Sequence, residues 1–236
     1  LDDMNAAVVI VTYNRKELLK ECIECVYSQI TKFKYVVVVD NACSDGSSDW
    51  LDTLQYDNIH IIHEKTNGGG AKGFSDGVKY VHKNLDAEWL LLIDDDAMLS
   101  EDYLDVIMKE AEKHSDYQAF SGTVVTGGVI DITHRKRLIK DSNFNIVPVD
   151  INCYNEDSFE YDLSSFCGLI FKIDIITLIG YPRADYFIWY DDTEYSIRIK
   201  QVTKIININK SIINHKTKLV QGSAVLDWKG YYGIRN

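Results

Sequence analysis

Residues 89–96 read Trp-Leu-Leu-Leu-Ile-Asp-Asp-Asp, a short apolar run that ends in three adjacent carboxylates. Three similar runs precede it, at Ala7–Tyr13, Tyr35–Asp40 and Ile59–His63. Short runs rich in Val, Ile and Leu are typical of strands that are buried on both faces of a parallel sheet. The first hundred residues therefore predict an open α/β sheet whose strands are joined by right-handed crossovers.

Helical spacing appears between these runs, so we expect a mostly parallel sheet with helices on both faces. Apolar residues from Leu19 to Ile30 recur at helical spacing, and Asn14 with Glu17 three residues later resembles a capping box. The second half is less regular and richer in aromatic residues. The other expected elements are helices at Ser47–Leu54, Phe74–Val81, Asp102–His114 and Asp191–Gln201, and strands at Ala119–Val125, Phe166–Ile173 and Lys204–Ile208.

The composition is that of an ordinary globular protein. The chain has 236 residues, a formal net charge of −11 and only two prolines, Pro148 and Pro182. Because no Pro-rich linker divides it, we expect one continuous domain with two halves, a nucleotide-binding half at residues 1–100 and a more irregular half at residues 101–236. The acidic balance argues against nucleic acid as a partner, since phosphate binding needs a basic surface.

Cysteine count and hydropathy bear on the compartment. The chain has five cysteines, an odd number, and it is not small. Both features favour free thiols in a reducing cytoplasm over a disulfide framework. No apolar run in the sequence approaches the roughly 20 residues of a membrane span. We therefore expect a cytoplasmic protein.

The three carboxylates that end the fourth run are the most informative feature. Three adjacent Asp side chains repel one another, which costs stability unless a cation lies between them. In an extended segment Asp94 and Asp96 point to the same side, where they could hold Mg²⁺ or Mn²⁺ together with phosphate oxygens. The alternative is a solvated turn or helix N-terminus, where Asp is common.

A glycine-rich segment, Asn67–Phe74, follows the third run and precedes a helix. Such a segment can bind phosphate through its backbone N–H groups. Gly68, Gly70 and Gly73 also match the dinucleotide pattern of hydride-transfer enzymes. That pattern belongs after the first strand of a sheet, whereas here it follows the third. An oxidoreductase is therefore the rival hypothesis, and a flexible turn is the structural alternative.

A second carboxylate pair, Asp191 and Asp192, follows the aromatic segment Phe187–Tyr190. A carboxylate beside aromatic rings suits a general base next to a sugar-binding surface, although acidic residues also begin ordinary helices.

A basic cluster at His134, Arg135, Lys136, Arg137 and Lys140 is either a solvated loop or a contact for anionic lipid or for the pyrophosphate of a polyprenyl-linked acceptor.

Taken together, the motifs resemble those of inverting family 2 glycosyltransferases with a GT-A fold, which join a Rossmann-like nucleotide half to an acceptor half. The resemblance covers essentially the whole chain, and the glycine segment, the triple Asp and the Asp-Asp-x-Glu segment look most like bacterial galactofuranosyltransferases, with rhamnosyltransferases close behind. The collinear landmarks are Val11–Arg15, Asp40–Gly46, Asn67–Gly69, Asp94–Asp96, Asp191–Arg198, His215 and Tyr231-Tyr232.

The resemblance implies roles for donor-site residues. Thr12 and Asp40 would bind the nucleoside, with Asp40 facing the base. Asp94, Asp96 and His215 would hold the metal, Mn²⁺ or Mg²⁺, against the diphosphate. The other implied nucleotide-binding positions are Tyr13, Asn14, Arg15, Asn41, Asn67, Gly68, Gly69, Lys72 and Asp95.

The resemblance also implies how the acceptor side works. Asp192, with Asp191 beside it, would be the base that takes a proton from the acceptor hydroxyl. Trp189 would stack on the acceptor, but Tyr190, not a Trp, directly precedes the Asp pair, which departs from the galactofuranosyltransferase pattern. The implied partners are a nucleoside diphosphate sugar and a glycan or polyprenyl-linked acceptor, with peripheral contact at the inner face of the plasma membrane.

The family continues beyond Tyr231-Tyr232, so we expect a further C-terminal segment. A non-catalytic sugar-binding domain with the same fold is the remaining alternative.

Overall fold

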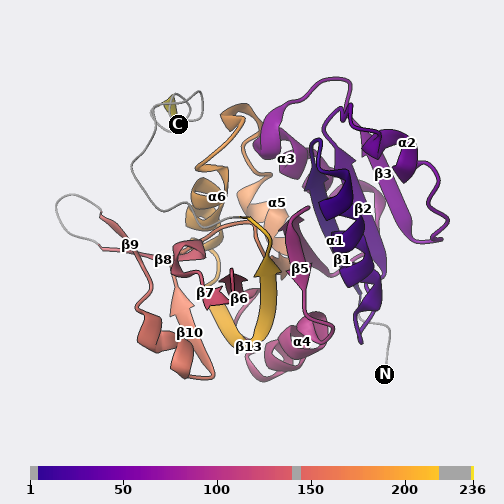
Figure 1. The fold of residues 1–236 in the computed structure, drawn as a ribbon. Helices are drawn as coiled ribbons and strands as arrows, with labels where there is room; N and C mark the ends of the chain where they lie inside the picture. Colours follow the sequence, from indigo (N-terminus) through magenta and orange to yellow (C-terminus); the bar gives the residue numbers. More distant parts are fainter. Residues whose placement is uncertain (1–4, 140–144, 218–234) are drawn as a thin grey trace.

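The computed structural model describes residues 5–139, 145–217 and 235–236 (Figure 1). Lys140 of the basic cluster and the Tyr231-Tyr232 landmark lie outside the described residues. Within the described part, no helix combines the length and the apolar character that crossing a bilayer requires.

The first half forms a parallel sheet in the order β4-β1-β2-β3. The apolar runs predicted these strands almost residue for residue, because three of them are buried almost throughout and the third run is partly buried. The strands are β1 (Ala6–Thr12), β2 (Tyr35–Asp40), β3 (Ile59–His63) and β4 (Trp89–Asp94). Their carboxyl ends lie at one edge of the sheet, where Thr12, Asp40 and Asp94 come together.

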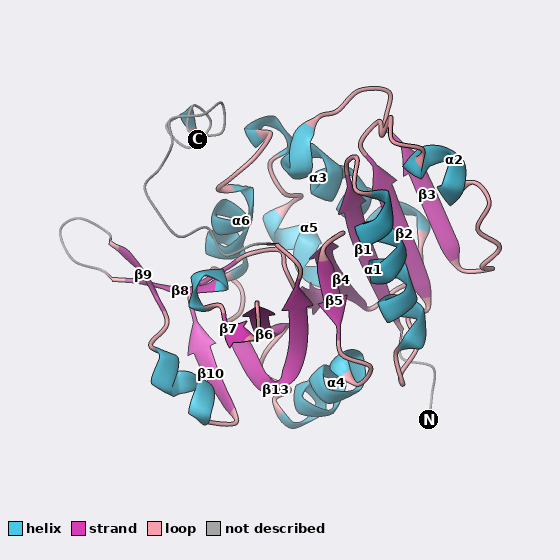
Figure 2. Cartoon of the chain, in the orientation of Figure 1, coloured by secondary structure: helices cyan, strands magenta, loops and turns pink. Residues whose placement is uncertain are grey.

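Both faces of this sheet are covered by helices (Figure 2). Along β1 the side chains alternate: Val8 packs with helix α1 (Lys16–Ser28), whereas Val9 packs on the opposite face with α3 (Gly69–Asn84). A short helix, α2 (Ser47–Leu51), follows β2. The predicted open α/β sheet with helices on both faces is confirmed.

The second half extends the same sheet with mixed strand directions. β12 pairs antiparallel with β4 and so joins the two halves. The strands are β5 (Ala97–Leu99), β6 (Ala119–Thr126), β7 (Val129–Ile130), β10 (Ser158–Tyr161), β12 (Leu169–Lys172) and β13 (Ile205–His215). The helices are α4 (Tyr103–Lys113), α5 (Ile176–Ile179) and α6 (Asp191–Ile199).

Strand β13 is longer than the predicted run at Lys204–Ile208. Its pairing with β6 shifts register between Ile208 and Ile212, and the residues at the shift are polar. The irregularity hides the continuation of the strand from a pattern search. It matters because β13 ends at His215, which the extra residues carry to the edge of the sheet beside β5.

Residues 127–150 contribute to a small second sheet. Its strands are β8 (Arg135–Leu138), β9 (Ile146–Pro148) and β11 (Leu163–Ser164). Elsewhere in the described part of the second half, short 3₁₀ segments lie at η1 (Ile132–His134), η2 (Ile151–Asn155), η3 (Ile173–Ile175) and η4 (Ala184–Tyr186). Arg135 is only 1% exposed and donates to the carbonyls of Gly122 and Cys167. It is therefore a structural residue, and its assignment to a solvated or lipid-facing cluster was wrong.

The predicted capping box is also wrong. Helix α1 begins at Lys16 without a side-chain cap, and Asn14 has a left-handed φ of 52°. The Asn14 Oδ1 atom accepts a hydrogen bond from the backbone N–H of Ser44, at 2.7 Å. The asparagine thus ties the loop after β1 to the loop after β2, and the helix end is not its partner.

Candidate functional site

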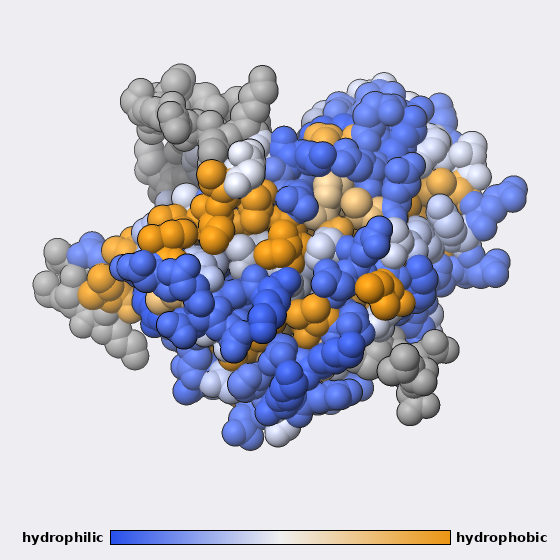
Figure 3. Space-filling model, turned by 60° about the horizontal axis from the view of Figure 1, so that its bottom comes forward, coloured by the Kyte–Doolittle hydropathy of each residue, from blue (hydrophilic) through white to orange (hydrophobic). Residues whose placement is uncertain are grey.

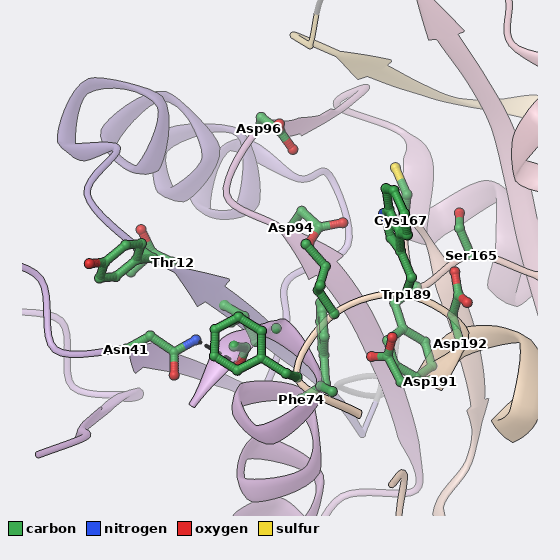
Figure 4. A pocket seen from close by; sticks show the side chains of 18 of the residues that line it. Thr12, Asn41, Phe74, Asp94, Asp96, Ser165, Cys167, Trp189, Asp191 and Asp192 are labelled. Atoms are coloured by element: carbon green, nitrogen blue, oxygen red, sulfur yellow. Dashed lines mark hydrogen bonds between the residues drawn. The ribbon is translucent and has the colours of Figure 1, made fainter. Parts of the chain in front are cut away.

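A cavity of about 650 Å³ opens at the carboxyl ends of the parallel strands, between the two halves. Figure 4 shows Thr12 and Asn41 on one side, Asp191, Asp192 and Trp189 on the other, and Asp94 between them. Twelve of the residues predicted for the site line this cavity: Thr12, Tyr13, Arg15, Asn41, Asn67, Gly69, Asp94, Asp96, Trp189, Asp191, Asp192 and His215.

Five predicted site residues do not line the cavity: Asn14, Asp40, Gly68, Lys72 and Asp95. Lys72 points to two acidic side chains instead, forming ion pairs with Glu64 and, at 2.6 Å, with Asp76. Its ammonium group is thereby already neutralised, so the geometry gives no support to the predicted contact between Lys72 and the nucleotide.

Asp40 is buried and holds the loop after β2. Its carboxylate accepts hydrogen bonds from the Cys43 N–H (2.8 Å) and the Ser48 hydroxyl (2.6 Å), and lies 2.7 Å from His63 Nδ1. Burial alone would raise the pKa of Asp40, but these hydrogen bonds lower it overall. The predicted contact between Asp40 and the nucleoside base would therefore compete with three internal partners.

At the end of β4, Asp95 turns away from the cavity while Asp94 and Asp96 line it. Asp95 is fully buried, accepts a hydrogen bond from the Thr12 hydroxyl at 2.7 Å, and lies 3.1 Å from Arg15 Nε. Arg15 Nη1 also contacts Asp96, at 2.5 Å. One guanidinium group thus bridges two of the three carboxylates and offsets part of their repulsion.

The three carboxyl groups differ in proton affinity. Burial and the neighbouring Asp96 and Asp95 raise the pKa of Asp94 to about 7, and burial raises that of Asp95 to about 6. Burial opposes the charge on Asp96 as well, but the nearby His215, the charge of Arg15 and a hydrogen bond from the Thr217 hydroxyl to Oδ2 hold its pKa well below the ordinary value. Asp96 is therefore the carboxylate that stays ionised.

These residues fit a divalent cation. Among the described residues Asp96 Oδ1 has no hydrogen-bond donor although it is buried, and it lies 3.4 Å from His215 Nε2. An unpartnered buried carboxylate oxygen costs free energy, which a cation would recover. Oxygen ligands with one imidazole suit Mn²⁺ or Mg²⁺.

The opposite wall carries the second carboxylate pair, at the start of α6. Three non-glycine residues before it have left-handed φ angles: Phe187 (66°), Trp189 (67°) and Tyr190 (67°). Asp192 Oδ1 accepts a hydrogen bond from the Thr193 N–H at 2.6 Å. The three left-handed φ angles before the pair are strained backbone conformations, which cost free energy and are typical of functional loops.

Burial dominates the acid–base behaviour of this pair. It raises the pKa of Asp191 to about 8, with a further contribution from the neighbouring Asp192. Burial also raises the pKa of Asp192, although hydrogen bonds from Thr193 act in the opposite direction. Carboxylates with raised pKa values are better proton acceptors than ordinary ones, once they are ionised.

The glycine segment forms the first turn of α3 and contacts the strained loop. Gly69 has φ +80°, and a Cβ at this position would lie 2.0 Å from the carbonyl oxygen of Phe187. The Ala71 N–H donates to the same oxygen (3.2 Å), and the Gly69 N–H donates to Asn67 Oδ1 (2.8 Å). Two amides of the predicted phosphate cradle therefore have protein partners.

Several lining residues were not found from the sequence. Phe166 and Cys167 were predicted to lie in a strand, which begins only at Leu169, and Ser165 directly precedes that predicted strand. His134 had been grouped with the basic cluster, and nothing in the sequence singles out Asp131. The ligand atoms of Asp131, His134 and His215 all lie within 4.8 Å of one another. Their proximity depends on β6, β7 and β13, whose pairing no local pattern reveals.

Comparison with known proteins agrees with this geometry. The chain is 28% identical to galactofuranosyltransferase GlfT1 of Mycolicibacterium smegmatis over 81% of this chain and 64% of the relative. It is 22% identical to the low-salt glycan biosynthesis hexosyltransferase Agl10 of Haloferax volcanii, over 85% of this chain and 62% of that protein. The chain thus spans less than two thirds of the length of these relatives.

Solved structures share the fold. The structure of GalNAc-T7 with UDP, GalNAc and Mn²⁺ superposes with a TM-score of 0.73 and 16% identity, covering 94% of this chain and 46% of that one. S. aureus TarS 1–349 in complex with UDP-GlcNAc gives a TM-score of 0.68 and 16% identity, over 98% of this chain and 64% of the other. Both are glycosyltransferases, so the predicted GT-A architecture is confirmed.

The family model described as Glycosyl transferase family 2 matches residues 7–192, which include β1, the Asp94–Asp96 cluster and the Asp191-Asp192 pair. The chain belongs to glycosyl transferase family 2.

Proposed function

We propose that this protein is a metal-dependent inverting glycosyltransferase that moves a sugar from a nucleoside diphosphate to an acceptor hydroxyl. The proposal rests on two groups of carboxylates that line one cavity from opposite walls, Asp94 with Asp96 on one wall and Asp191 with Asp192 on the other. One wall offers Asp96, ionised and partly unpartnered, and the other offers Asp192, a half-buried carboxylate with raised pKa.

On the donor wall, Asp94, Asp96 and His215 would hold the ion, which when bound offsets the negative charge that grows on the leaving diphosphate. Arg15 lines the cavity while it pairs with Asp96, so its guanidinium group is also within the donor site. The Thr12 and Asn41 side chains line the same side and supply polar contacts for the nucleoside.

On the acceptor wall, Asp192 takes the proton of the attacking hydroxyl. The hydrogen bond from the Thr193 N–H fixes one carboxylate oxygen of Asp192, and the other remains for the acceptor. A single displacement from the face opposite the leaving group inverts the anomeric configuration, through an oxocarbenium-like state. Trp189, 46% exposed beside the pair, offers an aromatic surface to the acceptor.

For the donor we propose UDP-galactofuranose, because the relative that matches over 81% of this chain is a galactofuranosyltransferase. dTDP-rhamnose is the alternative. The ligands bound in the structural neighbours, UDP and UDP-GlcNAc, favour a uridine nucleotide. The acceptor would be a cell-surface glycan or its polyprenyl-linked precursor, met at the cytoplasmic face of the plasma membrane.

An apolar area near β8 and β9 supports peripheral membrane contact. Figure 3 shows apolar surface at this end of the molecule, where Ile139 and Ile146 are 45% and 44% exposed. Arg137 of β8 is exposed two residues before Ile139, whereas Arg135 is buried. Apolar side chains with a neighbouring cation suit the surface of an anionic bilayer.

A thermal-shift panel followed by a donor screen tests the proposed function. We expect UDP with Mn²⁺ to stabilise the protein more than UDP with EDTA, and UDP-galactofuranose to lose its sugar on addition of a glycan acceptor. Stabilisation by NAD alone would instead support an oxidoreductase. Nucleotide binding without sugar release from any donor would support a non-catalytic binding domain.

A further inference from the structure

A cluster of one carboxylate and two imidazoles lies on the rim of the cavity, beside the Asp94–Asp96 cluster. Asp131 caps the start of η1, His134 ends it, and His215 ends β13. We propose that Asp131, His134 and His215 form a second cation site, selective for Zn²⁺, which competes with the donor-site metal for His215. The competition, but not the site itself, rests on the function proposed above.

The spacing of the ligand atoms suits a small tetrahedral ion. His134 Nε2 lies 3.5 Å from Asp131 Oδ2, and the three ligand atoms lie within 4.8 Å of one another. Ligands about 2.0–2.1 Å from a tetrahedral Zn²⁺ are about 3.4 Å apart. The first two residues already have this separation, so only the third ligand must move inward. A site with two imidazoles also favours Zn²⁺ over Mg²⁺.

The side chains around the cluster orient its ligands. Asp131 accepts hydrogen bonds from the hydroxyl groups of Thr126 (3.0 Å) and Thr133 (2.6 Å), while His134 Nδ1 contacts the Ser165 hydroxyl at 2.7 Å. Metal-binding imidazoles almost always have such a partner on the nitrogen that does not bind the ion. The side chains of His134 and Asp131 are only 13% and 10% exposed, so they are held in place by packing as well.

His215 belongs to both sites, one nitrogen facing each. Its Nε2 lies 3.4 Å from Asp96 Oδ1, whereas its Nδ1 lies 3.5 Å from the Thr126 hydroxyl, which in turn contacts Asp131. A neutral imidazole has one lone pair for a metal and carries a proton on the other nitrogen. His215 can therefore serve one site at a time, so each ion must weaken binding of the other by the same factor.

Zinc titration of the intact protein without nucleotide tests the site. We expect His134→Gln and Asp131→Asn to weaken Zn²⁺ binding at least tenfold in competition with a chromogenic chelator. The matched controls are His114→Gln and Asp116→Asn, which change a histidine and an aspartate outside the cavity and should leave the Zn²⁺ affinity unchanged. Zn²⁺ affinity that survives both cluster substitutions but is lost in Asp96→Asn would overturn the proposal.

A second titration tests the competition. Saturating Zn²⁺ should weaken Mn²⁺-dependent UDP binding at least tenfold in the unaltered protein and less than threefold in His134→Gln. Equal antagonism in the two proteins would overturn the competition. If UDP binding proves independent of Mn²⁺ while Zn²⁺ binding still requires His134, the proposed metal dependence fails and the second site stands. Circular dichroism of each variant confirms that it is folded.

Discussion

Two groups of carboxylates line the same cavity, but their surroundings differ. The Asp94–Asp96 cluster at the end of β4 is surrounded by compensating groups, since Arg15 contacts both Asp95 and Asp96, and His215 and Thr217 contact Asp96. The pair Asp191 and Asp192 at the start of α6 has no ion pair among the described residues, and Lys136 acts on Asp192 only through longer-range attraction.

The difference separates two kinds of chemistry. Cations and hydroxyl donors favour the charged form of a carboxylate, so Asp96 stays ionised and remains able to hold a metal. Burial without a counter-ion favours the protonated form, so Asp191 and Asp192 have raised pKa values and bind protons readily. In the proposed function, the charged wall would hold a diphosphate and its metal, and the proton-accepting wall would take the proton of an acceptor hydroxyl.

Removing the proton acceptor should have the largest effect. Asp192→Asn keeps the size of the side chain but abolishes its basicity, so we expect transfer to fall roughly 10²–10⁴-fold. Nucleotide affinity should stay within a few fold, because the donor wall is unchanged. Both quantities are measurable, by sugar release from the donor and by calorimetric titration of UDP.

Glu194 provides the matched control on the same helix. Its carboxylate pairs with Arg198 at 2.6 Å and does not line the cavity. Glu194→Gln should therefore leave transfer nearly unchanged. Equal losses in Asp192→Asn and Glu194→Gln would mean that helix α6 is merely perturbed, and retained turnover in Asp192→Asn would remove it from the role of base.

The next prediction concerns the contact that holds the two walls at a fixed separation. Gly69→Ala places a methyl group against the Phe187 carbonyl at a position with positive φ, which should cost about 2–4 kcal/mol of stability or displace the loop before Asp191. The neighbouring Gly70 has no atom within 4 Å of an added Cβ. Gly70→Ala should be neutral or slightly stabilising, because alanine favours a helix.

Urea denaturation and a transfer assay on the two glycine variants decide this point. A loss of transfer in Gly69→Ala with unchanged stability would indicate that the loop has moved. Equal behaviour of the two variants would show that the contact between α3 and the loop does not set the spacing of the walls.

The sequence predicted the two walls better than their surroundings. Strands such as Tyr35–Asp40 were predicted to the residue because their apolar runs are buried on both faces, which is a local property. Asp94, Asp96, Asp191 and Asp192 were expected at one site, and the structure gathers them there. The carboxyl ends of parallel strands always lie at one edge of a sheet, so this part required no long-range information.

Other features depend on contacts between distant residues. Arg135 is charged and adjacent to other basic residues, yet it is buried because carbonyls from β6 and from residue 167 surround its guanidinium group. The role of Asn14 depends on Ser44, and the cluster of Asp131 with His215 depends on how β13 pairs with β6. No periodicity or spacing encodes such partners.

The charged wall can be tested through its metal. Asp96→Asn removes the negative charge but keeps the shape, so Mn²⁺-dependent UDP binding should weaken at least about tenfold. Binding measured in EDTA should change much less, and it serves as the internal control. Equal UDP affinity in the two proteins, with and without Mn²⁺, would contradict the assignment of Asp96 to the metal.

The smallest expected effect is on stability, and it tests the proton-accepting wall without an assay of transfer. The pKa of Asp191 is about 8 in the folded protein and about 3.9 in an unfolded chain, so the folded state retains a proton that the unfolded state releases. Stability is therefore lost as pH rises from about 4 to 8.

Asp191→Asn cannot ionise and should be more stable than the unaltered protein at pH 8, by about 1–2 kcal/mol once coupling to Asp192 reduces the full linkage. The gain should vanish below about pH 3, where Asp191 is protonated in both states. Thermal unfolding across this range measures the difference, with Asp174→Asn on the exposed surface as control. A gain independent of pH would show that Asp191 is ionised in the folded protein, and the contrast between the two walls would then fail.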